Sequence, residues 1–277
     1  MGGADTFRLY GTELAHTEQL LNDGNYSGAT RVALTELAAE QAQQAGWAAF
    51  DAGHAVPALQ LFEYSRRAAD DAGSTDLVAN SFVHIAYATD ARTATHAADA
   101  ACQVVPVDAA PATLALVASR RAWSYAVAGD VGGAEHALEQ AWTSLESRPL
   151  AAAPHWSSWI DSTEIEIMTG RVWAVLHAPE KAIPALERAL LTYPDQWARD
   201  KALYSTWLAD AYIDAGEVDQ AASTLGRAVT LANPVASARP ANRIKEVAQR
   251  LTAYGLPEMS QLAERVAKLT PPLPAEL

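Results

Sequence analysis

The segment DAYIDAGEVDQAASTLGRAV, Asp210 to Val229, reads as two short amphipathic helices separated by Gly216. With the residues just before it, the segment defines a pattern of bulky, small and aromatic positions: Leu208, Ala209, Tyr212, Gly216, Ala221, Leu225 and Ala228. Small residues let two helices cross closely, and glycine ends the first helix because it adopts a positive φ at little cost. The stretch therefore predicts a packed pair of helices.

The same pattern recurs along the chain. Its turn positions fall at Gly53, Thr89, Gly129, His177 and Gly216, about every 40 residues, and the units at Thr89 and His177 depart from it because they lack the glycine. The spacing is close to the roughly 34-residue tetratricopeptide (TPR) period with longer loops. We expect an all-α fold, a TPR-like right-handed α-solenoid of about five helix pairs plus flanking helices. An Ala-rich helical bundle is the alternative.

The pattern also divides the chain. Residues 1–24 are expected to form an N-terminal segment or helix, and residues 25–237 the TPR-like repeats. Residues 238–270 are expected to form C-terminal capping helices, and residues 271–277, which are rich in proline, a disordered tail.

Composition restricts the partners. The 277 residues carry a net charge of −13, which opposes binding to nucleic-acid phosphates and anionic membranes. The single cysteine, Cys102, excludes an intramolecular disulfide and fits a reducing cytoplasm. No apolar run is long enough for a transmembrane helix, and no signal peptide is visible. We therefore expect a cytoplasmic chain that does not bind nucleic acid or membranes directly.

Catalytic and cofactor motifs are absent from the sequence. It contains no glycine-rich phosphate loop, no GxSxG elbow and no HExxH metal motif. His84 falls on an inward helix face, where a core or groove histidine is favoured over a pH sensor. Cys102 is expected to be a small buried residue rather than a redox sensor. We expect no enzyme activity, no cofactor and no metal.

Two blocks of sequence resemble a known family. One contains AGW-aromatic-DAG at Ala45–Gly53 and a helix ending at Tyr87, and the other runs from Lys201 through Glu217 to Ala221. They resemble the C-terminal TPR-like domain of actinobacterial transcriptional regulators with a lambda-repressor-like (Xre-type) helix-turn-helix. The resemblance covers about residues 20–268, and residues 1–35 show no helix-turn-helix pattern. It implies regulation of gene expression for the parent protein, and this chain is then either the isolated sensor half of such a regulator, without its DNA-binding part, or a stand-alone relative with another role.

The resemblance also implies a concave groove lined by the first helix of each pair. Mapped onto this chain, it predicts ligand-binding residues at Gln44, Trp47, Asn80, Val83, His84, Tyr87, Arg120, Trp123, Met168, Arg171, Trp207 and Asp210. Tryptophan and arginine are typical of binding hot spots, and arginine binds a carboxylate with two parallel bonds. Trp47 and Trp123 serve equally well as core residues, and ordinary ion pairs with Asp or Glu are favoured for Arg120 and Arg171.

These observations leave three hypotheses for the function. The first is a ligand- or peptide-sensing domain of a bacterial transcriptional regulator, homodimeric, with a small molecule or short peptide in its groove. The second is a stand-alone TPR adaptor that binds another protein. The third, a biosynthetic accessory protein or enzyme on the same scaffold, is the least favoured because no acid–base pair is evident.

Overall fold

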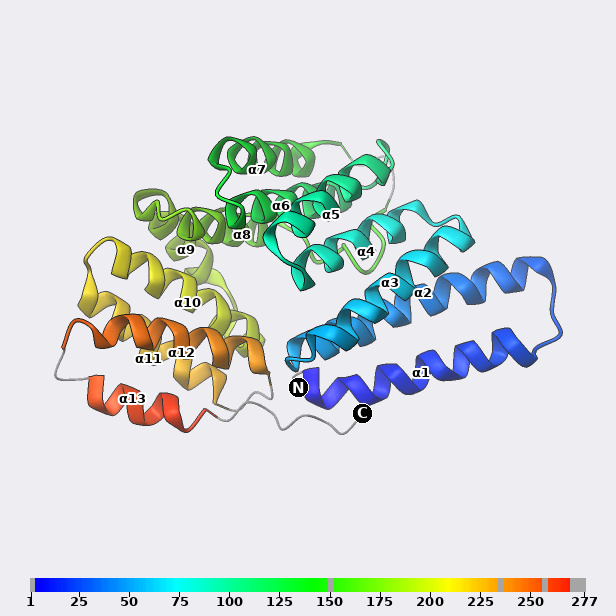
Figure 1. Cartoon of the computed structure of the whole chain (residues 1–277). Helices are drawn as coiled ribbons and strands as arrows, with labels where there is room; N and C mark the ends of the chain where they lie inside the picture. Colours follow the sequence, from blue (N-terminus) through cyan, green and yellow to red (C-terminus); the bar gives the residue numbers. More distant parts are fainter. Residues whose placement is uncertain (1–2, 149–151, 234–236, 256–258, 270–277) are drawn as a thin grey trace.

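The computed structural model describes residues 3–148, 152–233, 237–255 and 259–269. All regular secondary structure in these ranges is helical (Figure 1). The elements are α1 (Gly3–Asp23), α2 (Gly28–Asp51), α3 (Ala55–Ala72), α4 (Thr75–Ala88), α5 (Ala91–Val104), α6 (Pro111–Val127), α7 (Val131–Glu146), α8 (Ser162–Val175), α9 (Pro179–Thr192), the 3-10 helix η1 (Asp195–Trp197), α10 (Ala198–Asp214), α11 (Val218–Ala232), α12 (Ala238–Thr252) and α13 (Met259–Ala267). The prediction of an all-α chain is confirmed for this part of the molecule.

Consecutive helices pack in pairs at the turns that the sequence predicts: α2 with α3, α4 with α5, α6 with α7, α8 with α9, and α10 with α11. Gly53, Gly129 and Gly216 have φ angles of 94°, 78° and 78°, and His177 has a φ of 54° in the equivalent position. The residue after each of them donates its N–H to a carbonyl five residues earlier, which satisfies the end of the first helix. Thr89 differs because its backbone is extended, with φ −122° and ψ 173°.

Aspartates fix the starts of several helices. The side chains of Asp90, Asp130 and Asp161 accept hydrogen bonds from backbone N–H groups in the first turns of α5, α7 and α8. Such caps satisfy donors that have no partner within the helix. These three aspartates therefore have a local structural role.

The small residues of the pattern lie where helices touch. A Cβ atom on Gly46 would come within 2.5 Å of the Phe62 ring, and one on Gly170 within 2.4 Å of Leu186 Cγ. Ala122 and Ala209, at the same position of their pairs, are fully buried. The small residues of the pattern therefore mark the points where two helices cross closely, as predicted.

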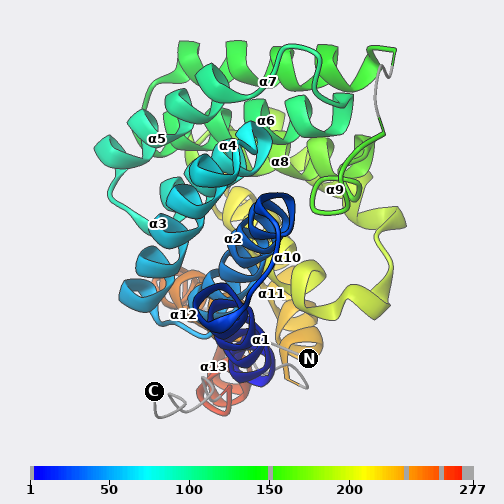
Figure 2. The same ribbon diagram turned by 90° about the vertical axis from the view of Figure 1, so that its right-hand side faces the viewer.

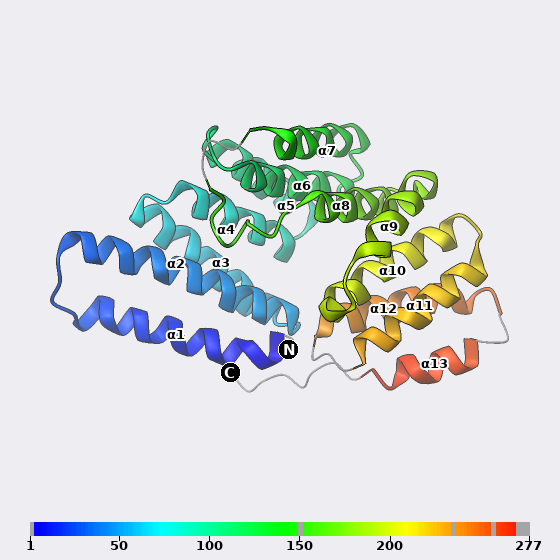
Figure 3. The ribbon, with the colours of Figure 1, turned by 180° about the vertical axis from the view of Figure 1, so that it is seen from behind.

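The helix pairs follow one another along an arch whose two ends approach each other. Figures 1 and 3, which view opposite sides, show the end of α2 beside the start of α12, and Figure 2 shows the arch from the side. A hydrogen bond of 2.9 Å from Ser237 Oγ to Asp51 Oδ1 joins these ends. The first helices of the pairs thus surround a common interior.

The ends of the chain and one further turn complete the description. The N-terminal part, expected to be a segment or a helix, contains α1, which packs on α2. A further glycine turn, Gly73 with φ 74°, connects α3 to α4 and was not in the predicted pattern. The tail at residues 271–277 lies outside the described residues. None of the described helices combines the length and apolarity that a bilayer-spanning segment requires.

Candidate functional site

A cavity of about 970 Å³ lies inside the arch. Its wall is formed by α1, α2, α4, α6, α8, α10, the segments 155–161 and 192–200, and Arg239 of α12. Eight of the predicted ligand-binding residues line it: Gln44, Trp47, Asn80, Val83, His84, Tyr87, Arg120 and Arg171. The groove inferred from the first helices therefore coincides with a cavity, and ligand contact by these residues stays a prediction.

A buried polar network holds the wall formed by α2 and α4. Gln43 Nε2 donates to Leu77 O and Ser81 Oγ, both at 3.0 Å, and Asn80 Nδ2 donates to Gln43 Oε1 at 2.6 Å. Ser65 Oγ of α3 lies 2.9 Å from Ser81 Oγ. Because Asn80 already donates to Gln43, its orientation is fixed before any ligand arrives.

The cavity contains two arginines without a carboxylate partner, contrary to the expectation of ordinary ion pairs. Arg120 and Arg171 are 9% and 5% exposed, and neither forms an ion pair with any described residue. The Arg171 Nε atom has no hydrogen-bond partner within the described chain, and its Nη1 atom donates weakly to Met168 Sδ at 3.6 Å. Although the sequence is rich in acidic residues, no described carboxylate lies within ion-pair distance of Arg120 or Arg171.

Tyr87 and His84 lie beside these arginines. Burial alone would raise the pKa of the Tyr87 phenol, but the charges of Arg120, Arg171 and Arg239 outweigh it and lower that pKa. Burial, reinforced by Arg120, lowers the pKa of His84 to about 3. His84 is therefore neutral near neutral pH, which argues against a pH sensor there.

Four acidic residues also line the cavity, Asp51, Asp161, Glu164 and Asp200, and Glu164 at the start of α8 is the one that acts on Arg120. Tyr193 Oη donates to Glu164 Oε1 at 2.9 Å, and Tyr204 Oη donates to Oε2 at 3.2 Å. Burial raises the pKa of Glu164, against the opposing effects of Arg120 and the two tyrosines. This carboxylate is therefore already hydrogen-bonded by two phenols.

A polar contact, here called the clasp, closes the cavity between the two ends of the arch. It consists of Asp51 at the end of α2 with Ser237 and Arg239 at the start of α12. Arg239 Nη1 lies 3.9 Å from Asp51 Oδ1, and Arg199 Nη1 lies 4.0 Å from Asp51 Oδ2. The Arg239 guanidinium also stacks 4.9 Å from the Trp47 ring centroid. The clasp thus places α12 directly against the wall of the cavity.

Four predicted ligand-binding residues are not part of the cavity lining: Trp123, Met168, Trp207 and Asp210. Met168 is 1% exposed, because it faces the core. Trp123 and Trp207 pack edge to face at 5.2 Å, with Arg171 stacked 4.5 Å from Trp123. Trp123, Met168 and Trp207 therefore pack against Arg171 without lining the cavity themselves.

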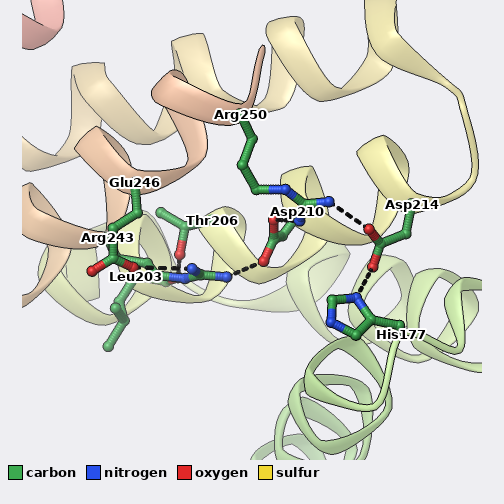
Figure 4. A network of polar contacts seen from close by, with 8 residues as sticks. All are labelled: His177, Leu203, Thr206, Asp210, Asp214, Arg243, Glu246 and Arg250. Atoms are coloured by element: carbon green, nitrogen blue, oxygen red, sulfur yellow. Dashed lines mark hydrogen bonds and ion pairs between the residues drawn. The ribbon is translucent and has the colours of Figure 1, made fainter. Parts of the chain in front are cut away.

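Asp210 belongs to an ion-pair network that joins three elements (Figure 4). Its two oxygens bind Arg243 and Arg250 of α12. Arg250 also binds Asp214 at 2.6 Å, and Asp214 Oδ2 lies 2.7 Å from His177 Nδ1 in the α8–α9 turn. The geometry corrects the predicted placement: Asp210 fastens α12 to α10 and does not face the cavity.

Sequence reasoning missed several wall residues. Trp156 and Trp159 lie between α7 and α8, Tyr193 and Trp197 lie between α9 and α10, and Arg239 comes from α12. These residues are outside the first helices that the repeat pattern maps. The longest spacing between turns, before His177, was the one available signal of an inserted wall segment.

Other candidate chemistry is weak. Burial raises the pKa of the Cys102 thiol, so it is a poor thiolate at neutral pH. Residues 3–148, 152–233, 237–255 and 259–269 contain no group of three or more His, Cys, Asp or Glu side chains that could hold a metal ion. No family model matches the sequence, and no curated protein matches it.

Proposed function

We propose that this chain is the TPR-like, ligand-sensing domain of a bacterial transcriptional regulator, and that its helix pairs form a right-handed solenoid around the ligand. The resemblance at Ala45–Gly53 and Lys201–Ala221 supports the regulator part of the proposal. The cavity supports the sensing part, since it has the size and mixed polar and aromatic wall typical of small-molecule sites.

One observation carries the proposal: side chains from six first-of-pair or capping helices converge on a single interior space. In a repeat architecture each unit contacts mainly its neighbours, so a change between units adds up along the chain. A ligand that touches α2, α6 and α10 at once would bias the distance between the two ends of the arch. Attached DNA-binding units would then change their spacing.

Native mass spectrometry of the purified chain, before and after denaturation, tests the sensing part. We expect unfolding to release a small molecule or short peptide from the wild type. The Arg120→Ala preparation should lack this mass, whereas Arg188→Ala, which removes an exposed arginine of α9, should retain it. A chain that is empty in all three cases and instead captures a protein partner, unaffected by Arg120→Ala, would favour the adaptor function.

The regulatory part needs a separate test in the native host. Deletion of the gene should change the transcript levels of a defined set of genes, and a copy with Arg120→Ala should fail to restore the ligand response. Light scattering of the purified chain would check the proposed homodimer. An unchanged transcriptome would contradict the regulator proposal and leave ligand binding intact.

A further inference from the structure

Arg120 and Arg171 are buried cations without a neutralising carboxylate. A buried charge is costly unless it is paired and hydrogen-bonded. Arg171 in particular is 5% exposed, and its Nε lacks a partner in the described chain. Its other polar contacts are the Met168 thioether sulfur and the Tyr87 hydroxyl, neither of which is a carboxylate. The free protein therefore holds two positive groups that a bound anion would stabilise.

Acidic residues are present near Arg120 and Arg171, so their lack of a carboxylate partner does not come from a shortage of acids in the cavity. Arg199 is paired with Asp200 at 3.0 Å and lies near Asp51, which also faces Arg239. Glu164, the acid that acts on Arg120 at longer range, has both oxygens hydrogen-bonded by tyrosines. The acids at this site are thus assigned to other groups, and the two arginines are left to face the cavity.

The two arginines act on the same place. The Arg120 guanidinium lies 5.7 Å from the centroid of the Tyr87 ring, and both arginines lower the pKa of the Tyr87 hydroxyl. Positive potential is therefore concentrated around one side chain of the cavity, although the whole chain carries a charge of −13. Such a local field favours an anion at that point.

An apolar surface lies beside this charge. Trp47, Tyr87 and Trp159, here called the aromatic wall, all line the cavity. Trp47 packs edge to face with Tyr87 at 5.6 Å, and Arg120 lies 5.8 Å from the Trp159 ring centroid. Flat rings offer contact area to a planar or hydrocarbon body, and the neutral His84 adds no competing charge.

We infer that the cavity binds an organic anion, whose carboxylate, sulfonate or phosphate oxygens lie on the guanidinium groups of Arg120 and Arg171 and whose apolar body lies on the aromatic wall. This inference rests on the proposed ligand-sensing function and specifies the chemical class of the ligand. Planar guanidinium groups suit oxyanions because they donate two parallel hydrogen bonds.

Two fluorescent probes test the inference on the full chain. Anilinonaphthalene sulfonate carries an oxyanion on an aromatic body, and phenylnaphthylamine has the same rings without the sulfonate. We expect wild-type protein to bind both probes. Arg120→Met and Arg171→Met should each weaken the sulfonate at least about tenfold, and leave the affinity for the neutral probe within about twofold.

The control is Arg188→Met, which removes one exposed positive charge and should change neither affinity. Circular dichroism of each variant establishes that it is folded. If the arginine substitutions weaken both probes equally, or neither, the inference of an anionic ligand is overturned and cavity binding stands. If no probe binds the folded wild type, the proposed sensing function fails together with it.

Discussion

Two groups of arginines, close in space, have opposite surroundings. On α12, Arg243 and Arg250 bind the two oxygens of Asp210, and the network continues through Asp214 to His177 (Figure 4). In the cavity, Arg120 and Arg171 form no ion pair with a described residue and lie against aromatic rings, the Tyr87 hydroxyl and a thioether. The same residue type therefore occurs in two different environments in one molecule.

The presence or absence of a carboxylate partner distinguishes the arginines that hold the helices together from those that line the cavity. Paired arginines hold α12 on α10 and thereby keep Arg239 at the wall of the cavity. Unpaired arginines contribute no such attachment, and their burial costs free energy in the empty protein. We read the first group as structural and the second as binding, and the following experiments test that distinction.

The largest effect should follow from breaking the network. Asp210→Ala removes the shared partner of Arg243 and Arg250 and leaves these cations partly buried. We expect the free energy of unfolding to fall by about 2–3 kcal/mol, less than for a fully isolated buried charge, because Arg243 keeps Glu246 and Arg250 keeps Asp214 as partners. Urea denaturation followed by circular dichroism measures the change.

Asp195→Ala is the matched control, since Asp195 is 81% exposed in its pair with Lys201. Its loss should cost less than about 1 kcal/mol. Equal losses in the two variants would show that the network is not a special support of the fold.

A pH titration of stability should show the burial of His84. Its pKa is about 3 in the folded state, against about 6.5 in an unfolded chain, so the unfolded state binds the proton first. Its contribution is complete above pH 6.5 and is lost as the pH falls towards 3. The slope is at most about 1.4 kcal/mol per pH unit, so the loss between pH 6 and 4.5 should be about 2 kcal/mol.

His84→Phe keeps the stacking on Phe62 and removes the titrating group. We expect the slope of unfolding free energy against pH, between pH 6 and 4.5, to become flatter than in the wild type. The exposed His16→Gln serves as the control. An unchanged slope in His84→Phe would contradict the neutral, buried assignment.

The smallest effect should come from the cavity arginines in the absence of ligand. Arg171→Met loses a cation–π contact with Trp123 but also removes an uncompensated charge. These terms oppose each other, so the free energy of unfolding should change by less than about 1 kcal/mol. Arg243→Met, which breaks the pair with Asp210, should lose clearly more.

Thermal and urea unfolding of both variants at the same pH provide the comparison. If Arg171→Met were destabilised as much as Arg243→Met, Arg171 would be a structural residue. The distinction between structural arginines and binding arginines would then not hold for Arg171.

The helix pairs could be predicted because their cause is local. Glycine is favoured at Gly53, Gly129 and Gly216 by a positive φ, and the small residues Gly46 and Gly170 are required by the close contact of two helices. These requirements repeat with each pair, so a single sequence displays them several times. His177 stands where the other turns have glycine, and it still adopts a positive φ.

The site could be predicted only in part, because its remaining residues meet through the overall curvature. The first helices supplied Trp47, Tyr87 and Arg120, whereas Trp159 and Arg239 reach the cavity from segments outside the repeat. The sequence also did not predict which carboxylate pairs with which arginine. An excess of acids made ion pairs at Arg120 and Arg171 the favoured expectation, yet pairing depends on which carboxylates lie within 4 Å and not on how many exist.

The clasp has a consequence for how the molecule is made. Its hydrogen bond joins Ser237 to Asp51 across 186 positions of the chain, whereas most helices pack on their immediate successors. Local packing forms readily during vectorial synthesis, and contacts between distant positions are slow to form. A nascent chain that has passed Arg171 already carries both cavity arginines, but the cavity lacks part of its wall until α12 emerges. Under the proposed function, ligand affinity is therefore acquired only with this late contact.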